Sequence, residues 1–325
     1  MKTKFLHIAT ALLFVGFTSS CSDFLDRYPL DELSDSSFWK TENDAMMAVT
    51  DIYGCLPTWD QDEDINSDNA VHGIKWAAGN ISKGVYDPMD QSWAGSYTPI
   101  RQCNLVLEKV KDIEMSDESR KKIEGQAYFF RAMQLFDLVR VYGAVPVVNK
   151  VLMAADREGA KDYNRESVET CVNQILSDLK EAANLLPTRK EWGSDQYGRL
   201  TKEAALAYRS RVALVFASPI FNADWNNTGS KRWKDALDIT LEAQAFLSSE
   251  GYGLYGNSAK DWNEMFYKFD NQECKEVIMV KLLASSTSKN DEHSGWQKTI
   301  RLKTMGGSGS GYHVPMGMLL SLIHI

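Results

Sequence analysis

Residues 117–146 read DESRKKIEGQAYFFRAMQLFDLVRVYGAVP and set the architecture of the chain. Apolar residues recur here every three or four positions in two adjacent stripes, one through Phe130 and Leu138 and the other through Tyr128 and Leu135. A helix with so wide an apolar face is buried on two sides. Gly143 and Pro146 supply a helix stop. We therefore predict a long central helix ending at about residue 142, covered by other helices.

Five further segments carry the same helical spacing of apolar residues. Polar residues suited to helix N-caps precede several of them, and prolines end others. The predicted helices cover about residues 41–56, 92–110, 167–187, 201–218 and 231–247. The centres of the later predicted helices are separated by close to the roughly 34 residues of a tetratricopeptide unit. The pattern predicts a mainly α fold, a tetratricopeptide-like helical-hairpin solenoid with insertions, and solenoids present a concave binding surface.

The predicted regularity is interrupted in two places. Residues 58–91 are rich in Asp, Asn and Gly, and a loop of this length inside a folded protein is usually functional. From residue 250 the chain becomes irregular, with a Ser/Gly-rich stretch at 285–311. The run Glu276-Val-Ile-Met-Val-Lys-Leu-Leu283 has β-branched content and predicts a short strand.

Composition excludes several classes of protein. The 325 residues are 44% hydrophobic and 11% aromatic, which is too much apolar material for a disordered chain. The net charge is −8, without a basic tract, so nucleic acid is not an expected partner. No cluster of His and Cys has the spacing of metal ligands, and we predict neither a metal site nor a cofactor.

The first 21 residues predict export. A basic start is followed by an apolar stretch too short to span a bilayer, and small residues precede Cys21. Small residues before a cysteine resemble a bacterial lipobox, in which Cys21 is lipidated, although Thr18 stands where leucine is usual. The alternative is an ordinary secretory signal. Two or more acyl chains would hold the protein stably on a membrane.

The other cysteines are Cys55, Cys103, Cys171 and Cys274. An even number in an exported protein permits disulfides. Cys103 and Cys171 nevertheless fall on apolar faces of predicted helices, where cysteine packs as a small hydrophobe. This favours buried free thiols.

The alternating Asp60, Asp62 and Asp64 are spaced as in a calcium loop. An EF-hand requires glycine at the sixth position and glutamate at the twelfth, where this chain has Ile65 and Val71. The EF-hand is therefore excluded, and a calcium site of another kind stays open.

Six blocks of residues, in order, resemble the SusD/RagB family of outer-membrane lipoproteins of Bacteroidota. Residues in these blocks include Cys21-Ser-Asp-Phe-Leu-Asp26, Phe38-Trp39, Cys103-Asn104, Gly125-Gln-Ala-Tyr-Phe-Phe-Arg-Ala132, Leu186-Pro187 and Gly198-Arg-Leu-Thr-Lys202. The resemblance covers nearly the whole chain after the leader. The residues themselves agree with this resemblance. Arg131 is a cation on an apolar helix, and we expect it to be a paired structural residue.

The resemblance implies a non-catalytic protein on the cell surface, anchored in the outer membrane through lipid on Cys21. It would bind glycans or other nutrients and deliver them to a SusC-like TonB-dependent transporter. The alternatives are a glycan hydrolase and a protein-contact scaffold without small ligand. No family motif fixes the ligand contacts. From the residues alone we nominate Trp76 and Trp296, because an aromatic ring among polar groups suits a sugar.

The expected domain organisation has four parts. Residues 1–20 form the signal peptide, 21–250 a helical domain and 251–319 part of a C-terminal region. The last six residues, Leu320-Ser-Leu-Ile-His-Ile325, match what a common sequencing adapter encodes. We expect the natural sequence to diverge after Leu319, so that the C-terminal region is incomplete here.

Overall fold

Helices make up most of the regular structure in the computed structural model, which describes residues 38–57, 70–72, 94–152, 163–223, 231–265, 272, 274–282 and 313–315. The elements are α3 (Glu42–Ile52), η2 (Tyr53–Cys55), β1 (Ala70–His72), α5 (Ala94–Lys109), α6 (Asp117–Tyr142), α8 (Val168–Leu185), α9 (Arg189–Trp192), η5 (Ser194–Gln196), α10 (Lys202–Ala217), α11 (Lys231–Ser249), α12 (Ala259–Met265) and β2 (His313–Pro315). The predicted mainly α class and all six predicted helices are confirmed, with small shifts at their ends.

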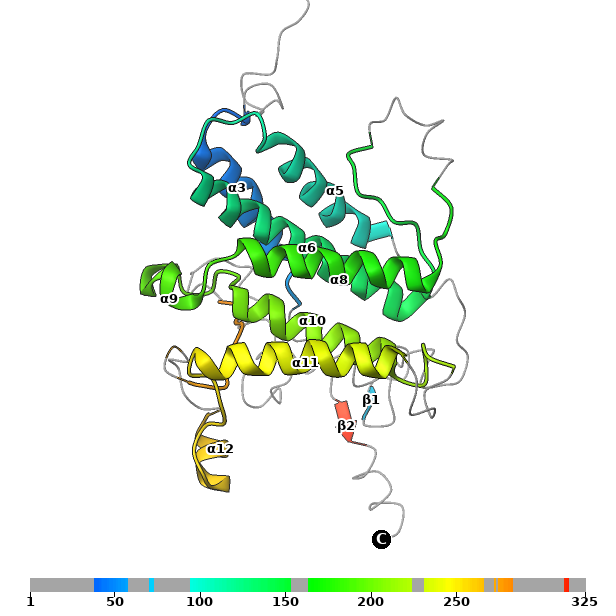
Figure 1. The fold of residues 1–325 in the computed structure, drawn as a ribbon, viewed down its shortest axis with the longest axis vertical. Coiled ribbons are helices and arrows are strands. Elements are labelled where there is room, and N and C mark those ends of the chain that lie inside the picture. Colours follow the sequence, from blue (N-terminus) through cyan, green and yellow to red (C-terminus); the bar gives the residue numbers. More distant parts are fainter. Residues whose placement is uncertain are drawn as a thin grey trace, which may run out of the picture.

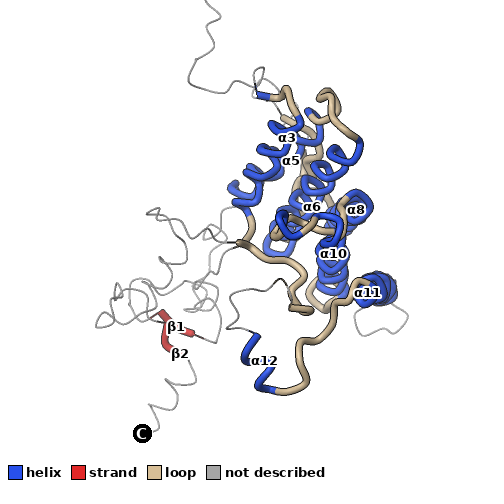
Figure 2. The backbone as a smooth tube through the Cα atoms, turned by 90° about the vertical axis from the view of Figure 1, so that its left-hand side faces the viewer, coloured by secondary structure: helices blue, strands red, loops and turns tan. Residues whose placement is uncertain are grey.

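Each long helix packs against the next along the chain, so that α5, α6, α8, α10 and α11 follow one another across the molecule (Figure 1). The first helix, α3, packs against both α5 and α6. Seen from the side, the strand pair lies apart from this helical body (Figure 2). The finer assignment to tetratricopeptide-type repeats stays a prediction.

Polar side chains fix where the long helices begin. Thr41, Ser116, Ser167 and Thr201 each accept a hydrogen bond from the backbone N–H three residues further on. Such an N-cap satisfies one of the backbone donors that the first turn leaves open, and it typically contributes ~1 kcal/mol. These caps lie where the sequence predicted helix starts.

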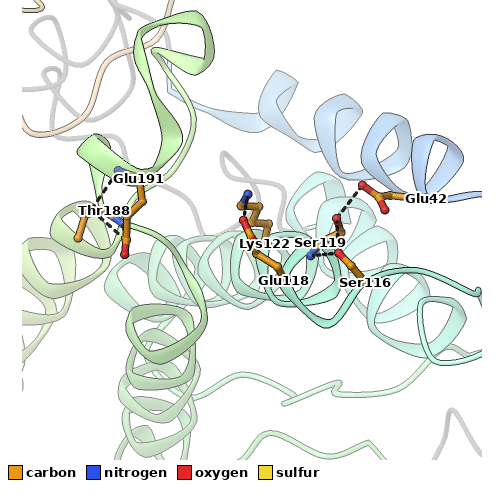
Figure 3. A network of polar contacts seen from close by, with 7 residues as sticks. All are labelled: Glu42, Ser116, Glu118, Ser119, Lys122, Thr188 and Glu191. Atoms are coloured by element: carbon orange, nitrogen blue, oxygen red, sulfur yellow. Dashed lines mark hydrogen bonds and ion pairs between the residues drawn. The ribbon is translucent and has the colours of Figure 1, made fainter.

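Two further polar groups near the helix starts are drawn in Figure 3. The Ser119 hydroxyl, itself within 2.9 Å of the capping Ser116 hydroxyl, donates to Glu42 Oε1 at 2.7 Å. This contact joins the start of α6 to the start of α3. Thr188 and Glu191 form a reciprocal capping box that begins the short helix α9. The contact between Ser119 and Glu42 thus holds two helix starts that are distant in the sequence against each other.

The centre of the core is α6. Phe129, Phe130 and Met133 on this helix are at most 1% exposed. Gly125 lies so close to α8 that a Cβ at this position would be 2.8 Å from Leu186 Cγ. The long central helix is therefore covered on two sides, by α5 and by α8, as its double apolar stripe predicted.

The predicted strand at 276–283 is wrong. Residues 277–282 form no strand, and the described chain contains one strand pair, β1 with β2, antiparallel with Val71 opposite Val314. The carbonyl oxygens of Val277 and Ile278 accept from the Arg189 side chain instead of from a neighbouring strand. The short helices α9 and α12 were not predicted.

Candidate functional site

The predicted ligand residues Trp76 and Trp296 lie outside the described residues, as does the predicted lipidation site Cys21. Their roles stay predictions. Among the described residues, polar chemistry is concentrated in a buried ion pair on α6, in side chains that hold the segment after α6 and the end of α3, and in two pockets beside α10.

The ion pair joins α6 to α8 in the protein interior. Arg131 Nε and Nη2 donate to the two carboxylate oxygens of Asp178, each at 2.7 Å, and Arg131 Nη1 donates to Asn104 Oδ1 at 2.9 Å. The three residues are between 2% and 8% exposed. A two-point contact between guanidinium and carboxylate combines charge with fixed geometry. Arg131 is thus paired, as its position on an apolar helix predicted, and its role here is structural.

The extended segment after α6 is held by side chains. Tyr97 donates from its hydroxyl to Pro146 O at 2.8 Å, and Asn104 Nδ2 donates to the carbonyls of Val148 and Lys150 at 3.0 and 3.1 Å. Burial raises the pKa of Tyr97 to about 12, so the hydroxyl keeps its proton and remains a donor at neutral pH. Tyr97 and Asn104, seven positions apart on α5, therefore both contact the same segment.

Tyr53 joins three separate parts of the chain. Its hydroxyl donates to Gln126 Oε1 at 2.6 Å and accepts from Leu200 N at 2.8 Å. Its ring lies edge-on to Phe130, with centroids 4.8 Å apart. Burial raises the pKa of Tyr53 to about 12. The end of α3 is thereby fixed against α6 and the loop before α10.

A pocket of about 180 Å³ lies where α9, the start of α10 and the chain after α11 meet. Glu203 lines it and is 1% exposed. Its Oε1 accepts from the backbone N–H of Arg189 at 3.0 Å, whereas Oε2 has no hydrogen-bond partner among the described residues. The hydroxyl of Tyr252, on the same pocket, is likewise buried without a partner in that part of the chain.

A larger cleft of about 320 Å³ lies between α8, α10 and the start of α11. Val172, Phe216 and Ile239 give it an apolar floor. On its rim, Lys231 Nζ and Asp235 Oδ2 form an ion pair of 2.6 Å. This ion pair satisfies the charges of Lys231 and Asp235 within the protein.

The described cysteines, Cys55, Cys103, Cys171 and Cys274, are free thiols. Cys103 and Cys171 are fully buried, as their positions on apolar helix faces predicted. Burial raises the pKa of Cys103, which leaves the thiol protonated and unreactive.

Within the described ranges, no three His, Cys, Asp or Glu side chains are grouped so that they could hold a metal ion. No helix there has the length and apolarity needed to cross a bilayer.

Comparison with known proteins places the chain in a family. Residues 24–214 match the model of a SusD-like family described as starch-binding and associating with the outer membrane. The match covers more than half of the chain, which therefore belongs to the SusD-like family. Two SusD-like proteins of Formosa agariphila are 26% identical over 296 residues and 22% identical over 299 residues, and these alignments include 85% and 86% of this chain. The chain spans about half the length of these curated relatives, 53% and 51% respectively.

Solved structures show the same fold. A SusD-like protein from Bacteroides fragilis superimposes with a TM-score of 0.64 and 26% identity, covering 80% of this chain and 48% of that protein. A protein described as a laminarin-binding SusD-like protein superimposes with a TM-score of 0.54 and 21% identity, covering 74% of this chain and 51% of its own. The resemblance stated from the residues is thus confirmed at the level of family and fold.

Proposed function

We propose that the protein captures glycans or other nutrients at the cell surface and delivers them to a SusC-like TonB-dependent transporter, without catalysis. The observation that carries the proposal is the family match over residues 24–214, whose description names starch binding and the outer membrane. The buried polar groups on α5, α6 and α8 support it, because Arg131, Asp178 and Asn104 bind one another and leave none of their charge for a substrate.

In this proposal Cys21 carries the lipid that anchors the protein in the outer membrane, facing outwards. Residues 1–20 are removed, residues 21–250 form the helical domain and residues 251–319 form part of a C-terminal region. Metabolic labelling with a radioactive or clickable fatty acid tests this step. Label should enter the chain and disappear in the Cys21→Ala variant. Incorporation that persists in the variant, or a chain that fractionates with the cytosol, would contradict the proposal.

For ligand capture we propose the aromatic rings of Trp76 and Trp296 as sugar platforms. A flat apolar ring can pack on the C–H face of a sugar while neighbouring polar groups bond its hydroxyls. A glycan array with the full chain tests this, with laminarin included because one structural neighbour is described as laminarin-binding. We expect binding to at least one glycan, weakened by Trp76→Ala or Trp296→Ala. Trp262→Ala is a matched control, because Trp262 is a 59% exposed tryptophan on α12.

The same array separates the alternatives. A glycan hydrolase would release shorter oligosaccharides from a bound glycan, and substitution of one carboxylate would abolish that release. A scaffold without small ligand would bind no glycan in either the parent or the tryptophan variants. Co-purification with a SusC-like transporter from the native membrane tests the delivery step, and its absence under mild detergent extraction would contradict that step alone.

A further inference from the structure

Residues 274–282 contain neither helix nor strand, and the start of this segment is firmly attached to the protein. Cys274 is 3% exposed. The Lys275 carbonyl and the Glu276 carboxylate accept backbone N–H groups from the chain after α11, at 3.2 and 2.9 Å. Residues 274–276 are therefore a fixed point.

The rest of the segment, residues 277–282, is held differently, and we call it the strap. Its first two carbonyl oxygens accept from Arg189 Nη2 at 2.7 and 3.3 Å. Near its other end, Lys281 Nζ donates to Leu56 O at 3.1 Å. Within the described ranges, its one hydrogen bond between backbone groups runs from its first N–H to the turn before it. Two cationic side chains thus take the place of a neighbouring strand.

Arg189 is positioned by the helical body and not by the strap. Its guanidinium lies over the Tyr197 ring at 5.5 Å and over the Tyr252 ring at 5.3 Å. Its backbone N–H donates to Glu203 Oε1 at 3.0 Å. A planar guanidinium can stack on aromatic rings and still donate hydrogen bonds. Arg189 is therefore ready to bind the strap carbonyls when the strap approaches.

The segment packs loosely against the body. The pocket of about 180 Å³ lies where the two meet, with residues of α9 and α10 on one side and Cys274 and Lys275 on the other. Well-packed interiors leave few voids larger than a water molecule. Within the strap, Ile278 packs against the main core, whereas Met279 and Leu282 are 38% and 58% exposed. Few buried apolar contacts and few backbone hydrogen bonds characterise segments that open at low free-energy cost.

We propose that the strap opens and closes over this edge of the helical body, turning about residues 274–276, and that Arg189 is its latch. The closed state is the one in the structure. Opening breaks the bonds of Arg189 and Lys281 to backbone carbonyls and uncovers the edge beside Leu56. This movement does not depend on the proposed glycan capture and stands or falls separately from it.

Cys55 can report opening in the natural chain. It adjoins Leu56, whose carbonyl accepts from Lys281 in the closed state. Burial raises the pKa of Cys55 to about 12, so the thiol stays protonated and reacts slowly. Opening admits water, lowers that pKa towards its usual value of ~8.5 and speeds the reaction. Cys103, buried on α5, and Cys274, at the fixed point, are internal references.

The test labels the full chain with iodoacetamide at pH 8 and measures the rate at each cysteine by mass spectrometry. Arg189→Ala removes the latch. Loss of its charge-assisted hydrogen bonds should raise the labelling rate of Cys55 about 10-fold or more. The rates of Cys103 and Cys274 should stay unchanged, because neither residue belongs to the strap.

Arg189→Lys is a milder variant that keeps the charge and loses the planar, stacked donor group, so its Cys55 rate should lie between those of the parent and Arg189→Ala. Lys190→Ala is the matched control on the same helix, because Lys190 pairs with Glu250 at 2.9 Å. It should label like the parent.

Three results would overturn the proposal. The first is a Cys55 rate that neither Arg189 variant changes. The second is labelling of Cys103 or Cys274 that rises in step with Cys55, because Arg189 would then stabilise the whole fold instead of latching the strap. The third is labelling of Cys55 in the parent as fast as in urea, because the strap would then not close in solution.

Discussion

Replacing Asp178 by asparagine would remove the charge of the buried ion pair and preserve its shape. Arg131 and Asp178 are 8% and 2% exposed, and two contacts of 2.7 Å join them. Removing one partner of such a pair leaves an uncompensated buried charge, which costs ~3–5 kcal/mol. Asparagine keeps one carbonyl acceptor for the guanidinium, so we expect the lower end of that range. The interaction is shielded from water, so salt should change the result little.

Urea unfolding followed by circular dichroism measures this loss. With a typical slope of ~2 kcal/mol per molar urea, a loss of ~3 kcal/mol lowers the midpoint by ~1.5 M. The double variant Arg131→Met with Asp178→Leu removes both charges and should be more stable than Asp178→Asn, because no charge is then left buried. Asp235→Asn, which breaks the exposed pair with Lys231, should leave the midpoint unchanged. A midpoint for Asp178→Asn within ~0.5 M of the parent protein would refute the reasoning.

Three further outcomes test the packing around α6. Gly125→Ala places a Cβ 2.8 Å from Leu186 Cγ and should lower stability in urea unfolding, because overpacking costs ~1–3 kcal/mol and exceeds the ~1 kcal/mol that alanine gains over glycine in a helix. Gly54→Ala, with no atom within 4 Å of the added Cβ, is its control and should be neutral. The pKa of Tyr53 is raised to about 12, above the unfolded value of ~10, so its contribution to stability is complete below pH ~10 and declines as the pH rises towards 12. Tyr53→Phe should remove part of that alkaline loss in a pH series of melting temperatures, and an unchanged series would contradict the assignment. Cys103 should resist iodoacetamide at pH 8 until urea unfolds the protein, as read by mass spectrometry, and fast labelling of the native chain would show that the thiol is accessible.

Local signals made the helices predictable. Thr41, Ser167 and Thr201 are N-caps in the sequence and in the structure, since capping depends on residues only three positions apart. The partner of Arg131 was not predictable, because Asp178 lies 47 residues away and periodicity does not specify pairs. The strand prediction failed because β-branched composition reports on extended backbone, whereas a strand also needs a neighbouring edge to pair with.

The candidate site residues also differ in whether the sequence alone could identify them. Trp76 and Trp296 could be nominated because aromatic residues in polar loops are visible in a sequence. Glu203 could not, because an acidic residue in the first turn of a helix is expected for helix capping alone. What sets Glu203 apart is that its Oε2 has no hydrogen-bond partner among the described residues. This depends on which atoms the fold places around the carboxylate, and the sequence does not specify them. The available signal was an acidic residue on the alanine-rich, buried face of the helix.

The irregular segment at 277–282 has a consequence for the order of assembly. Lys281 Nζ donates to Leu56 O, 225 residues earlier, and Ile278 packs against the main core. The edge beside Leu56 and Arg189 is therefore complete only when residues 277–282 are in place. The helices can associate without this segment, so a form of the chain that lacks it would leave the edge open to proteases.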